Sequence, residues 1–294
     1  MKKPPRLWLA VMPKSTGKLG VCLATSGPGA VYLLNGLYDA KSDTVPVLAI
    51  TGHTYHDLIG THYQQDINVR ALYADVALYN QQITDAQHVT TVTDMACRLA
   101  LAERGVAHIN FPIDLQEAAL KDDVPPMMKT QEHTSAVWMK AVLAPSSDEI
   151  KRAASVLNEG GKTAIVCGQG ALDCGELIEE SAEKLAAPIA KALLGKAVVP
   201  DDSPCTTGGI GLLGILPSEL AMEECDSLLI IGSNMPYVNY YPKAGQARAV
   251  QIDSDPSHLG WRYEIEVGLV GDARATLKAL LPLIERKNDH LLCQ

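Results

Sequence analysis

The sequence predicts an α/β protein with two doubly wound parallel-sheet domains, built from repeated strand, turn and helix units. Short apolar runs of about five or six residues alternate with longer segments whose apolar residues recur at helical spacing. Glycine-containing turns follow two of these runs, at residues 26–29 and 168–170. The 294 residues are enough for two domains of ordinary size, each with its own core.

The first expected domain covers residues 17–120. Residues 19–24 are apolar and too few for a stable lone helix, which indicates a buried strand. Residues 30–40 carry apolar positions at helical spacing, so they are expected to form the helix that follows. A right-handed crossover must join this strand to the next parallel one. The further elements expected here are a strand at 45–50, an amphipathic helix at 85–104 and a strand at 106–111.

The turn between the first strand and helix is the first candidate site. Gly27 and Gly29 allow a sharp bend and bring bare backbone close to any ligand above it, and Pro28 fixes one φ angle between them. Ligands of parallel sheets bind at the carboxyl ends of the strands, where this turn lies. A tight loop without a ligand is the alternative. The predicted cofactor-binding residues of this turn are Ser26, Gly27, Pro28 and Gly29.

The second expected domain covers residues 146–287. It follows an interdomain linker at residues 121–145, which shows no clean periodicity, and it precedes a tail at residues 288–294. The elements expected in this domain are helices at 147–158, 174–187 and 276–285 and strands at 163–167, 226–232 and 247–252.

Two glycine patterns in the second domain are candidates for a dinucleotide site. Gly168 and Gly170 lie between a strand and a helix, where helix amides face phosphate groups. The full Gly-x-Gly-x-x-Gly spacing occurs only at residues 209–214, and it follows what we expect to be a polar loop, whereas the fingerprint requires a strand. Asp253 is expected at the carboxyl end of a strand, where a carboxylate accepts hydrogen bonds from a ribose; a turn-capping role is the alternative.

Residues 17–29, 33–40 and 45–52 resemble the thiamine-diphosphate-dependent decarboxylase family over a long, ordered stretch. The resemblance is to the part of the pyrimidine-binding domain that contacts the aminopyrimidine ring of the cofactor. It implies that the domain at residues 17–120 is an incomplete pyrimidine-binding domain.

A nearly gapless series of short stretches lies at residues 187–189, 194–196, 211–214, 235–237, 241–242, 251–253 and 271–273. In these stretches the second domain resembles the central, FAD-binding domain of pyruvate oxidases and quinone-linked pyruvate dehydrogenases. The resemblance implies that a first loop lines the flavin, that a second loop contacts the isoalloxazine or ribityl region, and that two aspartates bind the adenosine end. Val238 stands where the family can carry a positive side chain. The residues with these implied roles are Leu212, Leu213, Gly214 and Ile215; Met235, Pro236, Tyr237, Val238 and Asn239; and Asp253 and Asp272.

Two functional parts of the family are not matched, so we expect a fragment that has no turnover alone. Lys2 falls where the family has its activating glutamate, and no catalytic residue is therefore assigned. Residues 1–16 are interpreted as an aberrant leader, and a start codon read out of frame in a damaged gene is the hypothesis for its origin. The motif that holds diphosphate through Mg²⁺, Gly-Asp-Gly with a later Asn, is absent, so the thiamine diphosphate site is expected to be incomplete.

The composition argues against some classes of binding partner. The net charge of −9 disfavours nucleic acid and anionic membrane surfaces, and no apolar run is long enough to be an integral membrane segment. The seven cysteines include no Cys-x-x-Cys pair, which predicts reduced core thiols and a cytoplasmic protein. Three histidines at positions 53, 56 and 62 lack the further ligands of a metal site, so no metal is predicted.

The sequence thus predicts a fragment of a pyruvate oxidase- or dehydrogenase-like enzyme that oxidatively decarboxylates a 2-oxo acid, with FAD as its expected cofactor. An acetolactate synthase-type carboligase fragment is one alternative. A non-catalytic FAD-binding or subunit-interaction fragment is the other. The resemblance also implies a homo-oligomer or a complementing subunit, because family enzymes form the thiamine site between two subunits.

Overall fold

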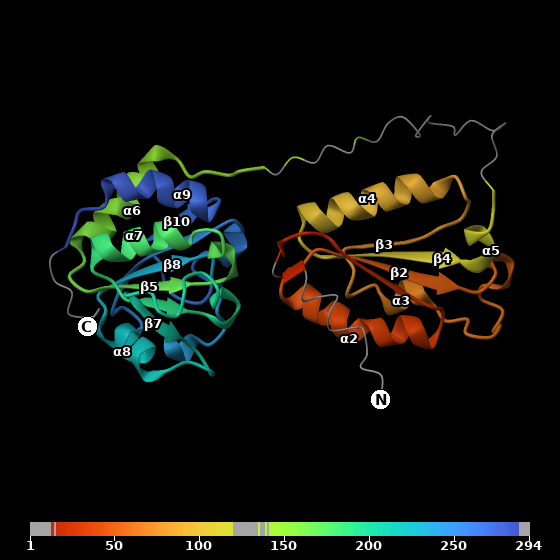
Figure 1. Cartoon of the computed structure of the whole chain (residues 1–294), viewed down its shortest axis with the longest axis horizontal. Helices are drawn as coiled ribbons and strands as arrows, with labels where there is room; N and C mark the ends of the chain where they lie inside the picture. The colour runs from red at the N-terminus through yellow and green to blue at the C-terminus, as the bar shows by residue number, and fades with distance from the viewer. Residues whose placement is uncertain (1–12, 15, 120–134, 136–138, 140, 288–294) are drawn as a thin grey trace. The chain divides into compact units, whose positions relative to one another are not determined.

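The computed structural model describes residues 13–14, 16–119, 135, 139 and 141–287 (Figure 1). The chain divides into two compact units, Met1–Lys140 and Ala141–Gln294, and each unit contains its own parallel sheet. The expected leader, linker and tail lie wholly or mostly outside the described residues. Their boundaries therefore stay predictions.

The first unit contains a four-stranded sheet in the order β1-β2-β4-β3, and all its neighbouring strands are parallel. The central strands β2 (Val47–His53) and β4 (Val106–Pro112) are buried for almost their whole length, as strands covered on both faces must be. The edge strands are β1 (Gly20–Ala24) and β3 (Tyr79–Gln82). The helices are α2 (Pro28–Ser42), α3 (Val69–Leu72), α4 (His88–Ala102) and α5 (Ile113–Gln116).

Helices cover both faces of this sheet, which confirms the doubly wound class (Figure 1). On one face, Leu33 and Leu37 of α2 pack with Cys22 of β1. On the other face, α4 packs over β2 and β4. At the edge strand β1 the side chain of Leu23 is 73% exposed, so this end of the sheet leaves an apolar residue uncovered.

The second unit contains a six-stranded parallel sheet in the order β10-β9-β8-β5-β6-β7. The order reverses between β5 and β8, since the chain moves outward on one side through β6 and β7 and then returns to the other. Ligands bind such sheets at the carboxyl ends near a reversal of this kind. The strands are β5 (Thr163–Cys167), β6 (Ile189–Lys191), β7 (Thr206–Gly209), β8 (Ser227–Ile231), β9 (Arg248–Asp253) and β10 (Val267–Val270).

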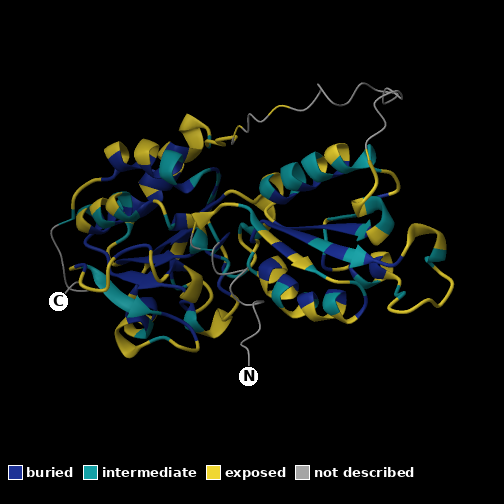
Figure 2. Ribbon diagram, turned by 45° about the vertical axis from the view of Figure 1, so that its right-hand side comes forward, coloured by how far each residue is buried: buried dark blue, intermediate teal, exposed yellow. Residues whose placement is uncertain are grey.

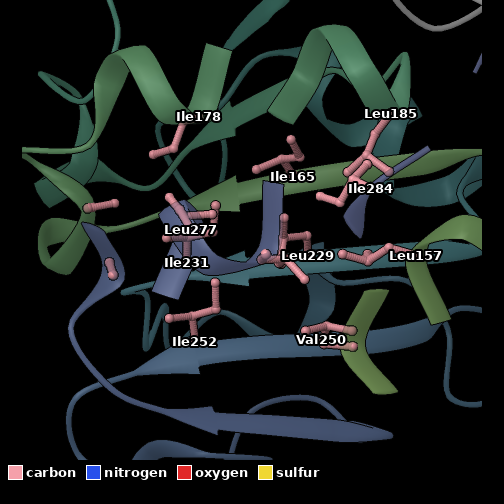
Figure 3. Close-up of a cluster of buried hydrophobic side chains, with 14 of the residues drawn as sticks. Leu157, Ile165, Ile178, Leu185, Leu229, Ile231, Val250, Ile252, Leu277 and Ile284 are labelled. Atoms are coloured by element: carbon pink, nitrogen blue, oxygen red, sulfur yellow. The ribbon is translucent and has the colours of Figure 1, made fainter. Parts of the chain in front are cut away.

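Helices again lie on both faces of the sheet (Figure 1). The larger core lies beneath α6 (Ser147–Glu159), α7 (Gly175–Leu185) and α9 (Ala273–Leu280), and α8 (Leu216–Glu224) covers the opposite face. Figure 3 shows aliphatic side chains of the larger core meeting between strands and helices, among them Ile165, Leu229 and Leu277. Burial in the sheets and exposure on the outer helix surfaces recur in both units (Figure 2).

Two expectations about the second unit were wrong, and two strands were missed. The polar loop expected before Gly209 is the edge strand β7, whose sequence Thr-Thr-Gly-Gly carries little strand signal. The helix expected at 276–285 ends at Leu280 and continues only as the 3₁₀ turn η7 (Leu281–Leu283), because Pro282 lacks the N–H that an α-helix needs. Strands β6 and β10 were not expected, since they have only three and four residues.

Candidate functional site

The turn after β1 is a sharp bend that requires glycine. Gly27 caps α2 with φ 60° and ψ −116°, a backbone conformation that L-residues rarely adopt. A Cβ atom at this position would lie 2.8 Å from the Cβ of Gln65. Pro28 then occupies the first turn of the helix, where no N–H is required. The predicted turn is therefore formed, and Ser26 Oγ donates a 2.8 Å hydrogen bond to Gln65 Oε1, which holds a second loop against it.

A chain of hydrogen-bonded polar side chains crosses strands β3, β4 and β2 of the first sheet. Asn80 donates its amide N–H to the carbonyl of Arg70 at 2.8 Å, so its oxygen accepts from His108 Nδ1 at 2.8 Å. The other ring nitrogen of His108 accepts from the Thr51 hydroxyl at 2.8 Å. Thr51 in turn accepts from the Asn110 amide at 3.1 Å. Each group thus has a defined donor or acceptor role, and the imidazole is neutral.

Burial keeps His108 neutral. Its side chain is fully enclosed and stacks on the ring of Tyr73 with centroids 3.9 Å apart. Loss of solvation lowers the pKa of this histidine to about 3, because charging a buried imidazole is unfavourable. The Tyr73 hydroxyl is also used, since it donates to the Ala30 carbonyl at 2.8 Å. This layer therefore fixes the strands beneath the turn and does not exchange protons at neutral pH.

Two buried oxygens near this edge make no hydrogen bond with the described residues: Asn110 Oδ1 and Thr54 Oγ1. Asn110 lies near the carboxyl end of β4, and Thr54 follows the end of β2. An unpaired buried oxygen costs about 1–3 kcal/mol, so a ligand or water that donates to it is favoured. Both atoms are near the strand ends, where a ligand of a parallel sheet would be expected.

The three histidines of the following loop do not converge on a metal. His53 is buried, accepts from the Thr54 amide at 2.9 Å and donates to the Ile67 carbonyl at 3.1 Å. His56 pairs with Asp114, and that hydrogen bond raises the pKa of the imidazole. In the described part of the chain, no group of three or more His, Cys, Asp or Glu side chains could hold a metal ion.

In the second unit, Gly168 and Gly170 let two loops pack together. A Cβ at Gly168 would lie 2.3 Å from the carbonyl oxygen of Gly232, and one at Gly170 would lie 2.8 Å from the Gly232 Cα. Their amides donate to the carbonyls of Ile231 and Gly232, each at 2.9 Å. These two N–H groups are therefore occupied by protein, and a cofactor-binding role for the two glycines stays a prediction.

The predicted flavin loops meet at a pocket of about 410 Å³. One loop follows β7 and the other follows β8, and both approach α8. Gly211 makes the approach close, because its φ is +99° and a Cβ there would lie 3.1 Å from the Tyr237 ring. The pocket is lined by Leu212 and by Pro236, Tyr237, Val238, Asn239, Tyr240 and Tyr241, with Glu219, Met222 and Glu223 of α8.

Four predicted loop residues do not line this pocket. Leu213 and Ile215 are exposed, and the Leu213 side chain is 77% accessible. Gly214 closes the turn by donating to the Gly211 carbonyl at 2.7 Å. Met235 is buried in the smaller core. Leu213 and Ile215 are nevertheless exposed apolar residues, as are their neighbours Leu212 and Leu216.

The two predicted aspartates lie at the carboxyl ends of neighbouring strands. Asp253 ends β9 and is largely buried; its Oδ1 accepts from the Asp255 amide at 2.9 Å, and His258 Nδ1 lies 3.4 Å away. Its other carboxylate oxygen accepts no hydrogen bond from the described residues. Asp272 is the N-cap of α9 and accepts from the Ala275 amide at 3.0 Å. Asp253 thus keeps an acceptor for a ligand, whereas Asp272 also has a structural role.

Several site residues were missed by sequence reasoning. Asn110 and Thr54 carry no motif, and their orphaned oxygens appear only when the strands pair. Glu219 and Met222 line the pocket from a helix that was not expected. Arg262, which the structure places beside the loop after β8 through a 3.0 Å hydrogen bond to Asn234, follows no recognisable pattern.

The chain thus has the architecture of an α/β protein with two parallel-sheet units, each with a candidate cofactor site at its strand ends. Residues 10–72 match the N-terminal TPP-binding domain of thiamine pyrophosphate enzymes, and residues 150–280 match the central domain of the same enzymes. The chain belongs to the thiamine pyrophosphate enzyme family.

Similar proteins occur in several bacteria and archaea. YdaP of Bacillus subtilis is 39% identical over 277 residues, which cover 94% of this chain and 47% of YdaP. An uncharacterized 42.6 kDa protein of Pseudomonas amyloderamosa is 35% identical over 94% of this chain and 67% of its own length. Pyruvate oxidase of Lactiplantibacillus plantarum is 32% identical over 93% of this chain and 45% of the oxidase.

Acetolactate synthase large subunits are also relatives, with 30% identity in Corynebacterium glutamicum. Apart from the Pseudomonas protein, the chain spans about half the length of these relatives. Among the described helices, none combines the length and the apolar character that crossing a membrane requires.

Proposed function

We propose that this chain supplies the pyrimidine-side part and the flavin-binding part of a thiamine diphosphate- and FAD-dependent enzyme that oxidatively decarboxylates a 2-oxo acid, with pyruvate as the expected substrate. One observation is the main support for the flavin assignment. The loop after β7 and the loop after β8 both line a pocket beside α8. The similarity to a pyruvate oxidase supports the same reading.

The residues present fit part of a flavin dinucleotide. The pocket of about 410 Å³ lies within the usual range for small-molecule sites, and its lining includes two aliphatic residues and three tyrosines. Glu219 and Glu223 also line it, so it suits an uncharged ring system and its hydroxyl groups better than a phosphate. Asp253 keeps a carboxylate oxygen for a ribose hydroxyl. Asp272 is proposed to lie near the adenine.

The first unit fits the aminopyrimidine end of thiamine diphosphate. The Ser26–Gly29 turn presents bare backbone at a strand end, and Asn110 and Thr54 have buried oxygens that lack donors among the described residues. Thiamine diphosphate, when bound, supplies the carbon nucleophile and the electron sink for decarboxylation, and a flavin accepts electrons. The role of this chain is then to orient the two groups and to exclude water from them.

Flavin binding is tested first, on the purified chain with added FAD. We expect quenching of flavin fluorescence and a shifted visible absorbance band. The Val238→Asp variant places a charge in the pocket and should weaken binding at least about tenfold, because burying an unpaired charge is costly. The Leu283→Asp control changes an exposed residue of η7 outside the pocket and should bind normally. Equal binding by the two variants would contradict the pocket assignment.

Activity separates the candidate reactions. Pyruvate-dependent dye reduction would favour the oxidase-like assignment, whereas acetolactate formation would favour the carboligase alternative that the acetolactate synthase relatives suggest. Flavin binding without either activity is expected if the chain acts only as a flavin-binding or subunit-interaction fragment. Our prediction for the chain by itself is bound flavin without turnover.

We further propose a homo-oligomer or a complementing subunit in the cytoplasm. The exposed Leu23 at the edge strand β1 supports an additional contact at that edge. Light scattering after size exclusion tests this, and a Leu23→Lys variant should reduce any association that the edge drives. A monomer at all concentrations would argue against a self-association role.

A further inference from the structure

The side chain of Arg262 is held in place but keeps most of its hydrogen-bonding capacity. Its Nε donates to Asn234 Oδ1 at 3.0 Å, and its guanidinium carbon lies 4.0 Å from the centroid of the Trp261 ring. A hydrogen bond and a cation–π contact together restrict a long side chain that is otherwise flexible. Its two terminal nitrogens donate to none of the described residues, so four N–H groups are available.

Arg262 also forms no salt bridge with the described residues. Three of the four other arginines of this unit, Arg248, Arg274 and Arg286, each lie within 4.0 Å of a carboxylate. Arg262 has no such partner among the described residues, and its neighbours are an amide, an indole and the Tyr241 phenol. A positioned guanidinium that lacks an anion is well suited to bind a phosphate group through two parallel hydrogen bonds.

A continuous set of contacts places Arg262 between the two ends of the proposed flavin site. At one end, Asn234 belongs to the loop that supplies Pro236 and Tyr237 to the pocket. At the other end, the Trp261 ring stacks on His258, with centroids 6.3 Å apart, and His258 Nδ1 lies 3.4 Å from Asp253 Oδ1. A dinucleotide has its diphosphate in the middle, between the flavin and the adenosine.

We propose that Arg262 binds the diphosphate of the dinucleotide. This assignment rests on the proposed flavin site. It also explains the polarity of the site, because Glu219 and Glu223 would repel a diphosphate placed in the pocket itself. Asn234 is then a positioning residue that orients the guanidinium through Nε.

The test compares FAD, ADP and riboflavin as ligands of the full chain. FAD and ADP carry the diphosphate, whereas riboflavin has the flavin ring without any phosphate. The Arg262→Gln variant should weaken FAD and ADP binding about 10- to 100-fold, as expected for loss of charged hydrogen bonds, and leave riboflavin binding within about twofold. Arg262→Lys should restore part of the loss. The Arg286→Gln control removes an exposed arginine outside the site.

Each outcome decides a separate point. Equal weakening of FAD and riboflavin, or no weakening of FAD and ADP, would overturn the role of Arg262 while leaving flavin binding intact. Arg262-dependent ADP binding without flavin binding would support the diphosphate site and overturn the proposed function. If the unchanged chain bound neither FAD nor ADP, both assignments would be wrong. Circular dichroism of every variant shows whether a loss of binding is caused by misfolding. If Arg262→Gln does not fold, binding by Arg262→Lys is compared with binding by the unchanged chain instead.

Discussion

Replacing His108 should remove a pH dependence from the stability of the first unit. The folded state holds this imidazole neutral, with a pKa of about 3 against an ordinary value of 6.5. Between these values the unfolded chain binds a proton that the folded chain does not, so stability falls as the pH falls below 6.5. From about pH 7.5 to pH 5.0 the linkage amounts to a loss of about 2 kcal/mol.

The assay is urea unfolding followed by far-UV circular dichroism, at several pH values in this window. Wild type and His108→Gln are compared, because the titration of the other histidines contributes similarly to both chains. The variant should be less stable at neutral pH, since it loses the contact with Tyr73. However, the free energy of its first-unit transition should fall about 2 kcal/mol less on acidification. Equal pH dependence, or an NMR titration of His108 with a midpoint near 6.5, would refute the reasoning.

Two further predictions concern the turn and the core. Gly27→Ala should cost about 1–3 kcal/mol in thermal or urea unfolding, because it combines a positive φ with a Cβ only 2.8 Å from Gln65. The matched control is Gly17→Ala, which has a φ of +66° and no atom within 4 Å of the added Cβ; a cost equal to that of Gly27→Ala would show that crowding is unimportant. Leu229→Ala should destabilise the second unit by about 2–5 kcal/mol, since its side chain is fully buried in the larger core. Hydrogen exchange should locate this loss in the second unit, and a change confined to the first unit would contradict it.

The sequence predicted elements well where a local pattern is strong. The strand at 163–167 and its glycine turn were located because an apolar run and a Gly-x-Gly sequence mark them. The α/β class and the two sheets were likewise confirmed. By contrast, β7 was taken for a loop, because its pairing with β6 depends on partners 17 or 18 residues away and not on its own composition.

The candidate site was only partly predictable for a related reason. Leu212 and Tyr237 were named from a resemblance, and the structure brings them to one pocket. The contact between Asn234 and Arg262 joins residues 28 positions apart, and the hydrogen bond between Thr51 and His108 joins residues 57 apart. Neither pair has a periodic signal. Such contacts are set by which strands lie side by side, and this order is a property of the folded sheet.

The close contact of Gly168 and Gly170 with Gly232 limits how the second unit can change shape. Backbone packs against backbone there, with the short side chain of Ser233 beside Gly168, so the loops after β5 and β8 have little that can rotate or repack at their junction. They should therefore shift together. Local adjustment to a ligand then falls to the exposed loop after β7, which has glycines at 211 and 214 and carries the exposed Leu212 and Leu213. On ligand binding, the loop after β8 would thus stay rigid, and the loop after β7 would change its conformation.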